Sequence, residues 1–511
     1  MDQTTTGNMF AIFTERCRKT PQAPLLILLD GTEISYSAAL AQTGQIASAL
    51  IGLGVKPGDR VAVQAEKSVF CLLLYLAVLR ADAVYLPLNT AYTPGELRFF
   101  LGDAMPALFV CRPADRAVMG PLCAELGIAR VACLDADGAG ELADLAAAQS
   151  ADAPFPSASG DDLAAILYTS GTTGRSKGAM LSHANLSSNA LMLKDYWRFT
   201  EADRLLHALP IFHTHGLFVA TNTVIAAGAA MIVLPKLDAA ELVRLMPQAS
   251  VLMGVPTFYT RLLAEPGFNR ETAKDMRLFI SGSAPLSAET HKDFAQRCGH
   301  AILERYGMTE TNMNTSNPYD GERVAGTVGF PLPGVELRIA DPESGRVLPQ
   351  GEVGVIEVRG PNVFKGYWQL PEKTAEEFRP DGFFITGDLA LIDPRGYVHI
   401  VGRAKDLIIA GGFNVYPAEV EAALDALPGV AESAVIGVPH PDLGEAVVAV
   451  IARCDSNLDE TAVIAALAGE LARFKQPRRV TFLDELPRNA MGKIQKNALR
   501  EQFGGLFAST K

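Results

Sequence analysis

The chain has 511 residues, of which 49% are hydrophobic and 20% charged, and its formal net charge is −12. This length exceeds the size at which one hydrophobic core stops growing, so we expect two or more domains. The acidic balance disfavours non-specific nucleic-acid binding, and the start of the chain lacks the basic and apolar segments of a signal peptide. Seven scattered cysteines without a Cys-x-x-Cys pair indicate a reducing compartment and predict a cytoplasmic protein.

Apolar strand-like runs alternate with helical patterns through the first part of the chain. Strands are predicted at residues 61–65, 84–87, 107–111, 130–134, 163–167, 229–234, 251–255 and 278–281, and a helix at 68–80. This alternation predicts an α/β fold with layered, largely parallel sheets. The one long uncharged run, residues 216–235, contains Thr221, Asn222 and Thr223, so it predicts a buried helix and strand rather than a membrane span.

From about residue 334 the pattern changes to short strands between Gly, Pro and Asp turns. Strands at 335–339, 354–358, 383–386 and 397–401 predict a small β-rich subdomain. Beyond it, a strand near 406–409, a helix at 417–426, a strand at 431–438 and a helix near 458–473 predict a small α+β unit. We therefore predict an N-terminal domain of residues 1–403 and a mobile C-terminal domain of residues 404–511.

The segment YTSGTTGRSKG (168–178) follows an apolar strand and is rich in glycine and hydroxyl residues. Glycines let the backbone approach an anion, and successive N–H groups with hydroxyls and a lysine add donors, so the segment predicts a polyphosphate-binding loop. Its spacing differs from a Walker A loop, because Lys177 is followed by Gly178 rather than by Ser or Thr. Further turn segments that could serve a ligand are SGSAP (281–285), ERYGMTE (304–310), TGD (386–388), Gly411-Gly412 and MGK (491–493).

Taken in order, several motifs resemble the acyl-adenylate-forming superfamily, which holds acyl-CoA synthetases, luciferases and peptide-synthetase adenylation domains. They are YTSGTTGRSKG (168–178), ERYGMTE (304–310), TGD (386–388), GRAKDLIIAGGFNVYPAEVE (402–421) and PRNAMGKIQK (487–496). Within it, HALPIFHTHG (207–216) and RYGMTETNMNTSNPYDGERV (305–324) are similar to malonyl-CoA synthetases. The resemblance implies that malonate and ATP form malonyl-AMP and pyrophosphate, and that coenzyme A then takes the malonyl group and releases AMP.

The resemblance also implies the residues that bind the nucleotide. They are Thr169, Ser170, Gly171, Thr172, Thr173, Gly174, Lys177, Gly282, Ser283, Ala284, Pro285, Glu304, Tyr306, Gly307, Thr309, Asp388 and Arg403. Residues 169–177 would hold the phosphates, Tyr306 would stack on adenine, and Asp388 and Arg403 would bind the ribose. Glu310 would hold Mg²⁺, a hard cation that prefers oxygen ligands and substrate phosphates.

The implied catalytic residues are Lys493, Thr309, Glu310 and His213. A carboxylate is already ionised at pH 7, so its attack on ATP requires charge neutralisation and alignment rather than a base, and Lys493 would supply the cation. Lys405 matches the family's hinge, and rotation there would bring Gly411 and Gly412 to the site to line the passage for CoA. The segment around Lys493 also resembles acetylated segments of related synthetases, which implies an acetyltransferase and deacetylase as partners.

The acid is selected by the acyl pocket, and malonate requires a cation for its second carboxylate. The resemblance implies Arg261, Ser283 and His213 as malonate ligands, whereas helical periodicity alone favours a solvent-facing Arg261. Methylmalonate, an oxalate-like diacid, or an aryl or medium-chain fatty acid are alternatives for the same chemistry. A phosphotransferase, which would form ADP, and a non-catalytic nucleotide-binding protein are rivals from other classes.

Overall fold

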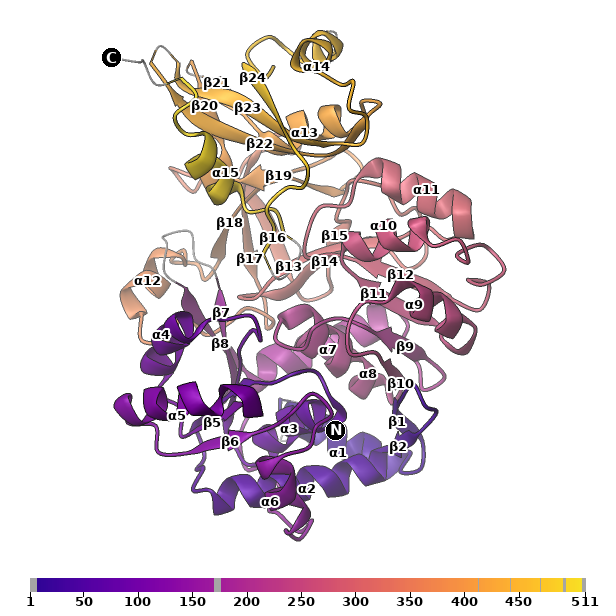
Figure 1. Cartoon of the computed structure of the whole chain (residues 1–511), viewed down its shortest axis with the longest axis vertical. Helices are drawn as coiled ribbons and strands as arrows, with labels where there is room; N and C mark the ends of the chain where they lie inside the picture. Colours follow the sequence, from indigo (N-terminus) through magenta and orange to yellow (C-terminus); the bar gives the residue numbers. More distant parts are fainter. Residues whose placement is uncertain are drawn as a thin grey trace.

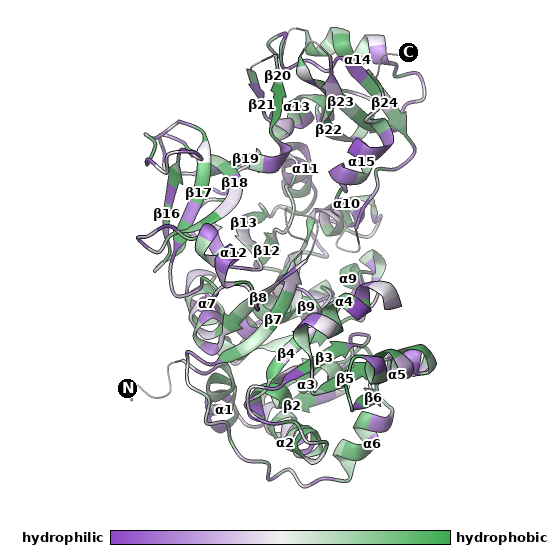
Figure 2. Cartoon of the chain, turned by 90° about the vertical axis from the view of Figure 1, so that its left-hand side faces the viewer, coloured by the Kyte–Doolittle hydropathy of each residue, from purple (hydrophilic) through white to green (hydrophobic). Residues whose placement is uncertain are grey.

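The structure is a computed structural model that describes residues 7–169, 176–411, 413–441, 443–468, 470–489 and 493–507 (Figure 1). Within these residues the strands form four sheets. Figure 1 shows a small C-terminal unit at one end of the molecule, with the four-stranded sheet next to it. The six-stranded sheet lies at the other end, and the nine-stranded sheet extends beside it. Hydrophobic residues concentrate along the sheet strands (Figure 2). The predicted mixed α/β fold with a small C-terminal unit is confirmed.

The six-stranded sheet has the order β6-β5-β3-β4-β7-β8 and is parallel except for the β7–β8 pair. Its strands are β3 (Arg60–Gln64), β4 (Val84–Pro87), β5 (Leu108–Cys111), β6 (Val131–Cys133), β7 (Leu163–Thr169) and β8 (Lys177–Ser182). Helix α3 (Val69–Arg80) is capped by Ser68, whose side chain accepts a hydrogen bond from the Cys71 N–H. This helix is apolar almost all round, and it is correspondingly buried from residue 71 onward.

The nine-stranded sheet has the order β15-β14-β13-β12-β11-β9-β10-β1-β2 and is parallel from β13 to β1. Its strands are β1 (Pro24–Ile27), β2 (Glu33–Ser35), β9 (Arg204–His207), β10 (Ala230–Val233), β11 (Val251–Gly254), β12 (Leu278–Ser281), β13 (Leu303–Met308), β14 (Asn312–Ser316) and β15 (Phe330–Pro331). The other helices before residue 380 are α1 (Met9–Lys19), α2 (Tyr36–Gly52), α4 (Pro94–Ala104), α5 (Arg116–Glu125), α6 (Glu141–Ala147), α7 (His183–Tyr196), α8 (Asn222–Ala227), α9 (Ala239–Leu245), α10 (Pro256–Ala264), α11 (Ala288–Cys298) and α12 (Pro371–Glu376). A π-helix, His215–Thr221, leads into α8, so the uncharged run folds as the predicted buried helix and strand.

Two smaller sheets complete the fold. The β-rich subdomain is an antiparallel sheet of β16 (Glu336–Ala340), β17 (Gly354–Arg359), β18 (Phe384–Ile392) and β19 (Val398–Arg403). The C-terminal unit contains β20 (Ile408–Ala410), β21 (Phe413–Val415), β22 (Val430–His440), β23 (Gly444–Arg453), β24 (Arg479–Leu483), α13 (Pro417–Asp425), α14 (Glu460–Leu467) and α15 (Lys496–Phe503). The helix predicted at 458–473 is therefore shorter than expected.

The C-terminal unit has hydrophobic clusters of its own. Two clusters of buried residues contain only side chains from residues 408 to 507. This separation agrees with a boundary after residue 403, which stays a prediction. Among the residues that the structure describes, no helix combines the length and the apolar character needed to cross a bilayer.

Candidate active site

The predicted site residues gather at the carboxyl ends of parallel strands. Ser283 follows β12, Tyr306 lies near the end of β13, and His207 ends β9. Ligands of open α/β sheets bind at this edge. Thr169 and Lys177 are register partners that flank the predicted phosphate loop on β7 and β8. The loop residues predicted between them lie outside the described residues: Ser170, Gly171, Thr172, Thr173 and Gly174.

Three predicted nucleotide-binding residues meet in one polar group. The Tyr306 hydroxyl donates to Asp388 Oδ2 at 2.6 Å, and Arg403 Nε lies 2.6 Å from Asp388 Oδ1. β18 and β19 bring the last two together, because Asp388 and Arg403 are register partners. The Asp388 charge is the main cause that raises the pKa of Arg403. The group thus places a buried carboxylate and a more exposed guanidinium where ribose hydroxyls could bind.

The part of the site predicted to bind adenine contains residues with an unusual or closely packed backbone. Ser283 has a positive φ of 72°, which is rare for a non-glycine residue and often marks a functional position, and its Oγ lies 3.3 Å from His215 Nδ1. Ala284 is half-buried and Pro285 exposed. A Cβ at Gly307 would lie 1.9 Å from the Asn312 carbonyl oxygen, so only glycine fits beside that carbonyl.

Lys493 of the C-terminal unit lies among groups of the N-terminal part. Burial lowers its pKa, and the charges of Arg403 and Arg305 act in the same direction, whereas Asp388 and Glu310 oppose the shift. The residue keeps access to solvent although these groups surround it. The structure therefore brings the predicted catalytic lysine to the residues predicted for ribose and metal.

The acyl side of the site is buried and polar. In the part of the chain that the structure describes, these buried atoms have no hydrogen-bond partner: His213 Nε2, Thr214 Oγ1, His215 Nε2, Ser281 Oγ and all three guanidinium nitrogens of Arg305. Burial lowers the pKa of His213 to about 3, with Lys493 adding to the shift, and lowers the pKa of His215 well below its usual range. Both imidazoles are therefore neutral at pH 7.

Arg305 is a functional candidate that the sequence reasoning missed. It is 3% exposed on β13, a strand paired on both sides by β12 and β14. A Cβ at Gly282 would lie 2.4 Å from the Arg305 Cζ, so glycine makes room for the guanidinium. Burial lowers the pKa of Arg305 to about 9, which leaves it a cation at pH 7. A charged residue within a doubly paired strand was the signal available in the sequence.

Arg261, the predicted malonate ligand, is exposed on α10. Tyr259, two residues earlier, is fully buried and donates its hydroxyl to the Ile280 carbonyl. Successive helical residues are about 100° apart, so Arg261 points away from that buried face. Its role towards malonate stays a prediction, as does the hinge role of Lys405, which is exposed in a short 3-10 turn (Ala404–Asp406). Gly411 has a φ of 60°, and Gly412 lies outside the described residues.

The predicted metal ligand Glu310 is buried, and its Oε1 accepts from the Tyr367 hydroxyl at 3.1 Å. Thr309, one residue earlier, is half-buried. Within the described ranges there is no cluster of three or more His, Cys, Asp or Glu side chains that could hold a metal ion. One carboxylate together with substrate phosphates is the arrangement that suits Mg²⁺, so the residues present fit that ion.

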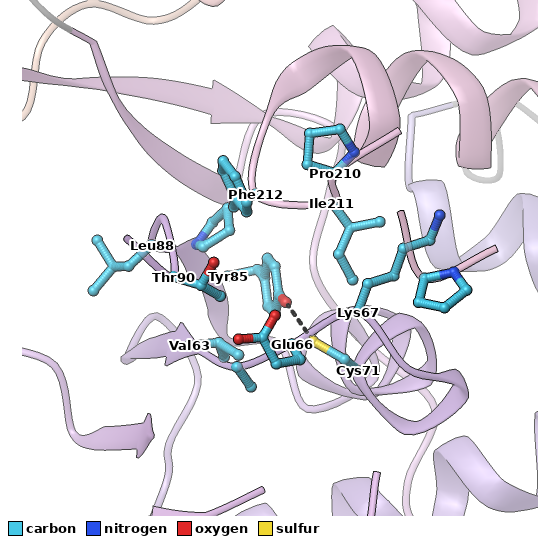
Figure 3. Close-up of a pocket in the computed structure, with 13 residues that line it drawn as sticks. Val63, Glu66, Lys67, Cys71, Tyr85, Leu88, Thr90, Pro210, Ile211 and Phe212 are labelled. Carbon is cyan, nitrogen blue, oxygen red and sulfur yellow. Dashed lines mark hydrogen bonds between the residues drawn. The ribbon is translucent and has the colours of Figure 1, made fainter. Parts of the chain in front are cut away.

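A second missed residue, Lys67, supports the segment that leads to His213. Its Nζ donates to the His207 carbonyl at 2.6 Å, to the Leu209 carbonyl at 3.1 Å and to His207 Nδ1 at 2.7 Å. His207 Nε2 lies 2.9 Å from the carbonyl oxygen of Gly216, so that nitrogen carries the proton. Lys67 also lines a cavity of about 60 Å³ together with Phe212 (Figure 3). This buried lysine fixes the backbone just before the acyl side.

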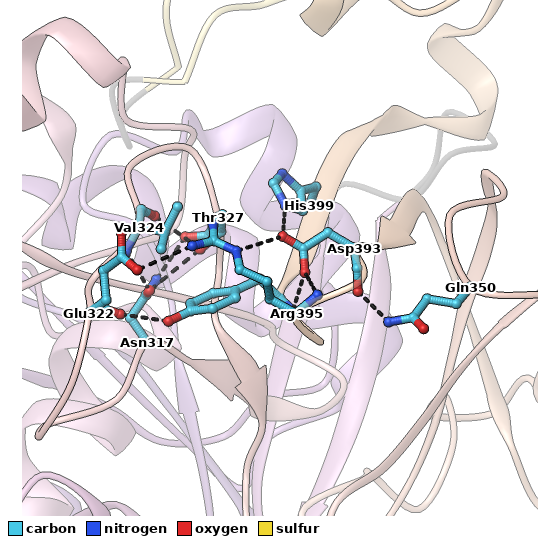
Figure 4. A network of polar contacts seen from close by, with 9 residues as sticks. Asn317, Glu322, Val324, Thr327, Gln350, Asp393, Arg395 and His399 are labelled. Carbon is cyan, nitrogen blue, oxygen red and sulfur yellow. Dashed lines mark hydrogen bonds and ion pairs between the residues drawn. The ribbon is translucent and has the colours of Figure 1, made fainter.

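A polar network fixes the loop that contacts Glu304 (Figure 4). Arg395 Nη1 lies 3.1 Å from Glu322 Oε2, and the Asn317 side chain accepts from the Val324 N–H at 3.1 Å. The same loop donates the Gly326 N–H to Glu304 Oε1 at 3.2 Å. Glu304 is buried, and burial raises its pKa to about 8.

Glu304 gives a pH-dependent prediction. Its folded pKa of about 8 exceeds the ordinary value of 4.5, so the folded protein holds a proton that the unfolded chain releases. The contribution of Glu304 to the free energy of unfolding is fully present below pH 4.5 and is lost as the pH rises towards 8. Glu304→Gln cannot ionise, so we expect its stability relative to wild type to rise by up to about 1.4 kcal/mol per pH unit in that window. Urea unfolding of the variant and the wild type at pH 5 and pH 8 measures this change, with exposed Glu343→Gln as the control. A difference in stability that is the same at both pH values contradicts the prediction.

The fold and the site define a two-part α/β enzyme. A lysine of the C-terminal unit lies near the edge of the N-terminal sheets where the predicted nucleotide-binding residues gather. The sequence model of the AMP-binding enzyme family matches residues 13–368, and that of the AMP-binding enzyme C-terminal domain matches residues 419–493. The chain belongs to the AMP-binding enzyme family and is one of its acyl-CoA ligases.

Characterised relatives of the chain use different acids. A feruloyl-CoA synthase of Amycolatopsis sp is 37% identical over 495 residues, which cover 96% of this chain and 98% of the relative. A malonate–CoA ligase of Arabidopsis thaliana is 35% identical over 494 residues, which cover 90% of this chain and 80% of the relative. These relatives are both acyl-CoA ligases, but the acids in their names differ.

Solved structures of MatB from Rhodopseudomonas palustris are similar over nearly the whole chain. ATP-bound MatB is 57% identical with a TM-score of 0.96, and apo MatB is 58% identical with a TM-score of 0.85; each comparison covers 98% of this chain and 100% of the other. The structure thus matches the ATP-bound arrangement more closely than the apo one, in agreement with the influence of the Asp388 and Glu310 charges on the pKa of Lys493.

Proposed function

We propose that the chain is a malonate–CoA ligase that forms malonyl-CoA through malonyl-AMP and releases AMP and pyrophosphate. The observation that carries this choice is the buried guanidinium of Arg305, which has no hydrogen-bond partner among the described residues. A malonate bound with one carboxylate at ATP presents a second carboxylate, which an arginine can grip with two hydrogen bonds. A hydrocarbon acid would leave the buried cation unpaired, which is costly.

The surroundings of Arg305 also suit a small polar acid. His213 and His215 are neutral at pH 7 and can donate to an oxyanion without adding charge, and Ser281 adds a hydroxyl. The resemblance to malonyl-CoA synthetases and the relative named malonate–CoA ligase support the same choice. Arg261, Ser283 and His213 remain proposed malonate ligands beside Arg305.

In the first half-reaction an oxygen of the acid forms a bond to the α-phosphorus of ATP. The bond from that phosphorus to the oxygen bridging it to the β-phosphate breaks, and pyrophosphate leaves with the electron pair. Lys493 stabilises the charge shared by the incoming carboxylate and the α-phosphate. Tyr306, Asp388 and Arg403 hold the nucleoside, and Glu310 would hold Mg²⁺, which neutralises phosphate charge when bound.

In the second half-reaction the CoA sulfur, having lost its proton, forms a bond to the acyl carbon. The bond from that carbon to the AMP oxygen breaks, and AMP leaves. Lys493 has no part in this step, and rotation at Lys405 would withdraw it and present Gly411 and Gly412. The domain boundary at residues 403 and 404, acetylation of Lys493 and a cytoplasmic location stay predictions.

The proposed function is tested with a panel of acids. Purified protein with ATP, Mg²⁺ and CoA is given malonate, methylmalonate, oxalate, propionate, octanoate or ferulate, and AMP, ADP and pyrophosphate are measured. We expect AMP and pyrophosphate, with kcat/KM for malonate on the order of 100-fold above that for propionate, because propionate lacks the second carboxylate. A preference for octanoate or ferulate contradicts the proposed acid, and ADP as the product contradicts the reaction.

A further inference from the structure

Lys177 was expected to hold phosphate, but its ammonium is engaged within the protein. Lys177 Nζ lies 2.7 Å from Glu377 Oε1 and 4.0 Å from the ring centroid of Tyr367. The Lys177 side chain is only 8% exposed and that of Glu377 only 19%. Lys373 Nζ, on a more exposed side chain, also lies 3.4 Å from Glu377 Oε1, so moving Lys177 would leave Glu377 with this weaker partner alone. The buried ion pair capped by an aromatic ring is therefore favoured over the alternative.

Tyr367 joins this ion pair to the predicted metal ligand. Its hydroxyl lies 2.7 Å from Glu377 Oε2 and 3.1 Å from Glu310 Oε1, and Tyr367 is buried. The phenol is thus the bridge between a carboxylate already neutralised by Lys177 and the carboxylate predicted to bind Mg²⁺. A hydroxyl held from one side can fix the side-chain orientation of Glu310 on the other.

The backbone fixes the same segment against the end of the phosphate loop. The Trp368 N–H donates to the Gly178 carbonyl at 2.7 Å, and the Met180 N–H donates to the Gly366 carbonyl at 2.9 Å. Ala179 and Tyr367 form an antiparallel bridge. The chain around Tyr367 is therefore an additional strand partner of β8, directly after the predicted phosphate loop.

We propose that Glu377 and Tyr367 are positioning residues of the phosphate end of the site: they fix Lys177 as a structural cation at the exit of the loop, and Tyr367 orients Glu310 towards the metal. Lys177 then acts on ATP by fixing the start of β8 rather than through contact with phosphate. The inference rests on the proposed ATP-dependent reaction, but its test needs only nucleotide and Mg²⁺.

Glu377→Gln separates the two roles of Lys177, because they predict opposite signs. A positioning role predicts weaker binding of MgATP, by about 5-fold or more in calorimetric Kd without acid, since the ion pair no longer fixes the start of β8. If Lys177 is instead a phosphate ligand that Glu377 holds back, the variant frees it and binds MgATP more tightly, which overturns the proposal. Glu372→Gln is the matched control, because Glu372 is exposed and lies on α12, the helix that leads to Glu377; we expect less than a 2-fold change.

The double variant Lys177→Met/Glu377→Gln controls for loss of MgATP binding that is caused by misfolding around a buried unpaired charge. Removing both charges leaves no buried unpaired ion, so we expect MgATP binding within about 3-fold of wild type and tighter than that of Lys177→Met alone. Double-variant affinity no better than that of Lys177→Met would show that the ammonium itself contacts phosphate. Absence of ATP binding by the wild type would instead refute the proposed function.

Tyr367→Phe tests the link to Glu310 and keeps the ring over Lys177. The Kd of ATP is measured by calorimetry with Mg²⁺ and with EDTA. We expect the Kd of the variant to match wild type within about 2-fold in EDTA, because the Lys177–Glu377 ion pair and the ring over Lys177 remain. With Mg²⁺ we expect it to lose at least 3-fold of the affinity that the ion adds, because the hydroxyl shared by Glu377 and Glu310 is missing. An unchanged gain from Mg²⁺ overturns the role of Tyr367.

Discussion

Replacing Lys493 by methionine is expected to stop adenylate formation while leaving thioester formation intact. Methionine keeps most of the length of the side chain but removes the cation, whose pKa is influenced by the charges of Asp388 and Glu310. Removing one preorganised electrostatic donor typically costs about 3 to 4 kcal/mol, so we expect pyrophosphate release from malonate and ATP to fall by on the order of 100- to 1,000-fold. Malonyl-AMP supplied with CoA should still give malonyl-CoA within about 3-fold of the wild-type rate.

Lys496→Gln is the matched control for this prediction. Lys496 lies three residues further on, and its ammonium is 2.5 Å from Glu421 within the C-terminal unit, so it does not serve the nucleotide. We expect both half-reactions of this variant to stay near wild type. Equal loss of both half-reactions in Lys493→Met would contradict a role confined to the first step.

Replacing Arg305 by methionine is expected to remove the selection of the diacid. The variant keeps the volume of the side chain but leaves the second carboxylate of malonate unpaired in a buried pocket. Breaking a buried charge pair typically costs about 3 to 5 kcal/mol, so kcat/KM for malonate should fall by on the order of 100-fold or more, with a much smaller effect on propionate. The ratio of the two values, measured as AMP release, is the quantity to follow.

Thermal stability is a second property by which the Arg305→Met variant can be tested. The unbound protein buries a cation that has no hydrogen-bond partner among the described residues, so methionine should raise the midpoint of thermal unfolding. Arg261→Met is the control, because Arg261 is exposed on α10 and its loss should change stability little. Loss of malonate turnover in Arg261→Met but not in Arg305→Met would show that Arg261, and not Arg305, binds the second carboxylate of malonate.

The fold was predictable where burial is continuous along the chain. The strands predicted at 84–87 and 278–281 coincide with β4 and β12, because these segments are buried on both faces and read as apolar runs. The helix predicted at 458–473 was wrong at its end, since α14 ends at Leu467. Local pattern gives the existence of an element more reliably than its boundary.

Site residues could be predicted from the sequence where they belong to a recognisable motif. They could not be predicted where their partners lie far away in the sequence. The sequence predicted Asp388, Arg403 and Lys493 as neighbours of the nucleotide, and the structure brings them together. The partner of Lys177 lies 200 residues away on the chain, and no local pattern connects the two. Arg305 was overlooked because its burial depends on the absence of a side chain at Gly282, a contact that only the fold reveals.

The two partners of Asp388 connect the site predicted for the ribose to the start of the C-terminal unit. Both of its oxygens are engaged, one by Tyr306 and one by Arg403. Arg403 is the last residue of β19, directly before the turn that leads to the C-terminal unit. A carboxylate oxygen can accept more than one hydrogen bond, so a ribose hydroxyl can bind Asp388 while Arg403 stays paired. A bound nucleotide would thereby be linked through Arg403 to the segment that enters the C-terminal unit.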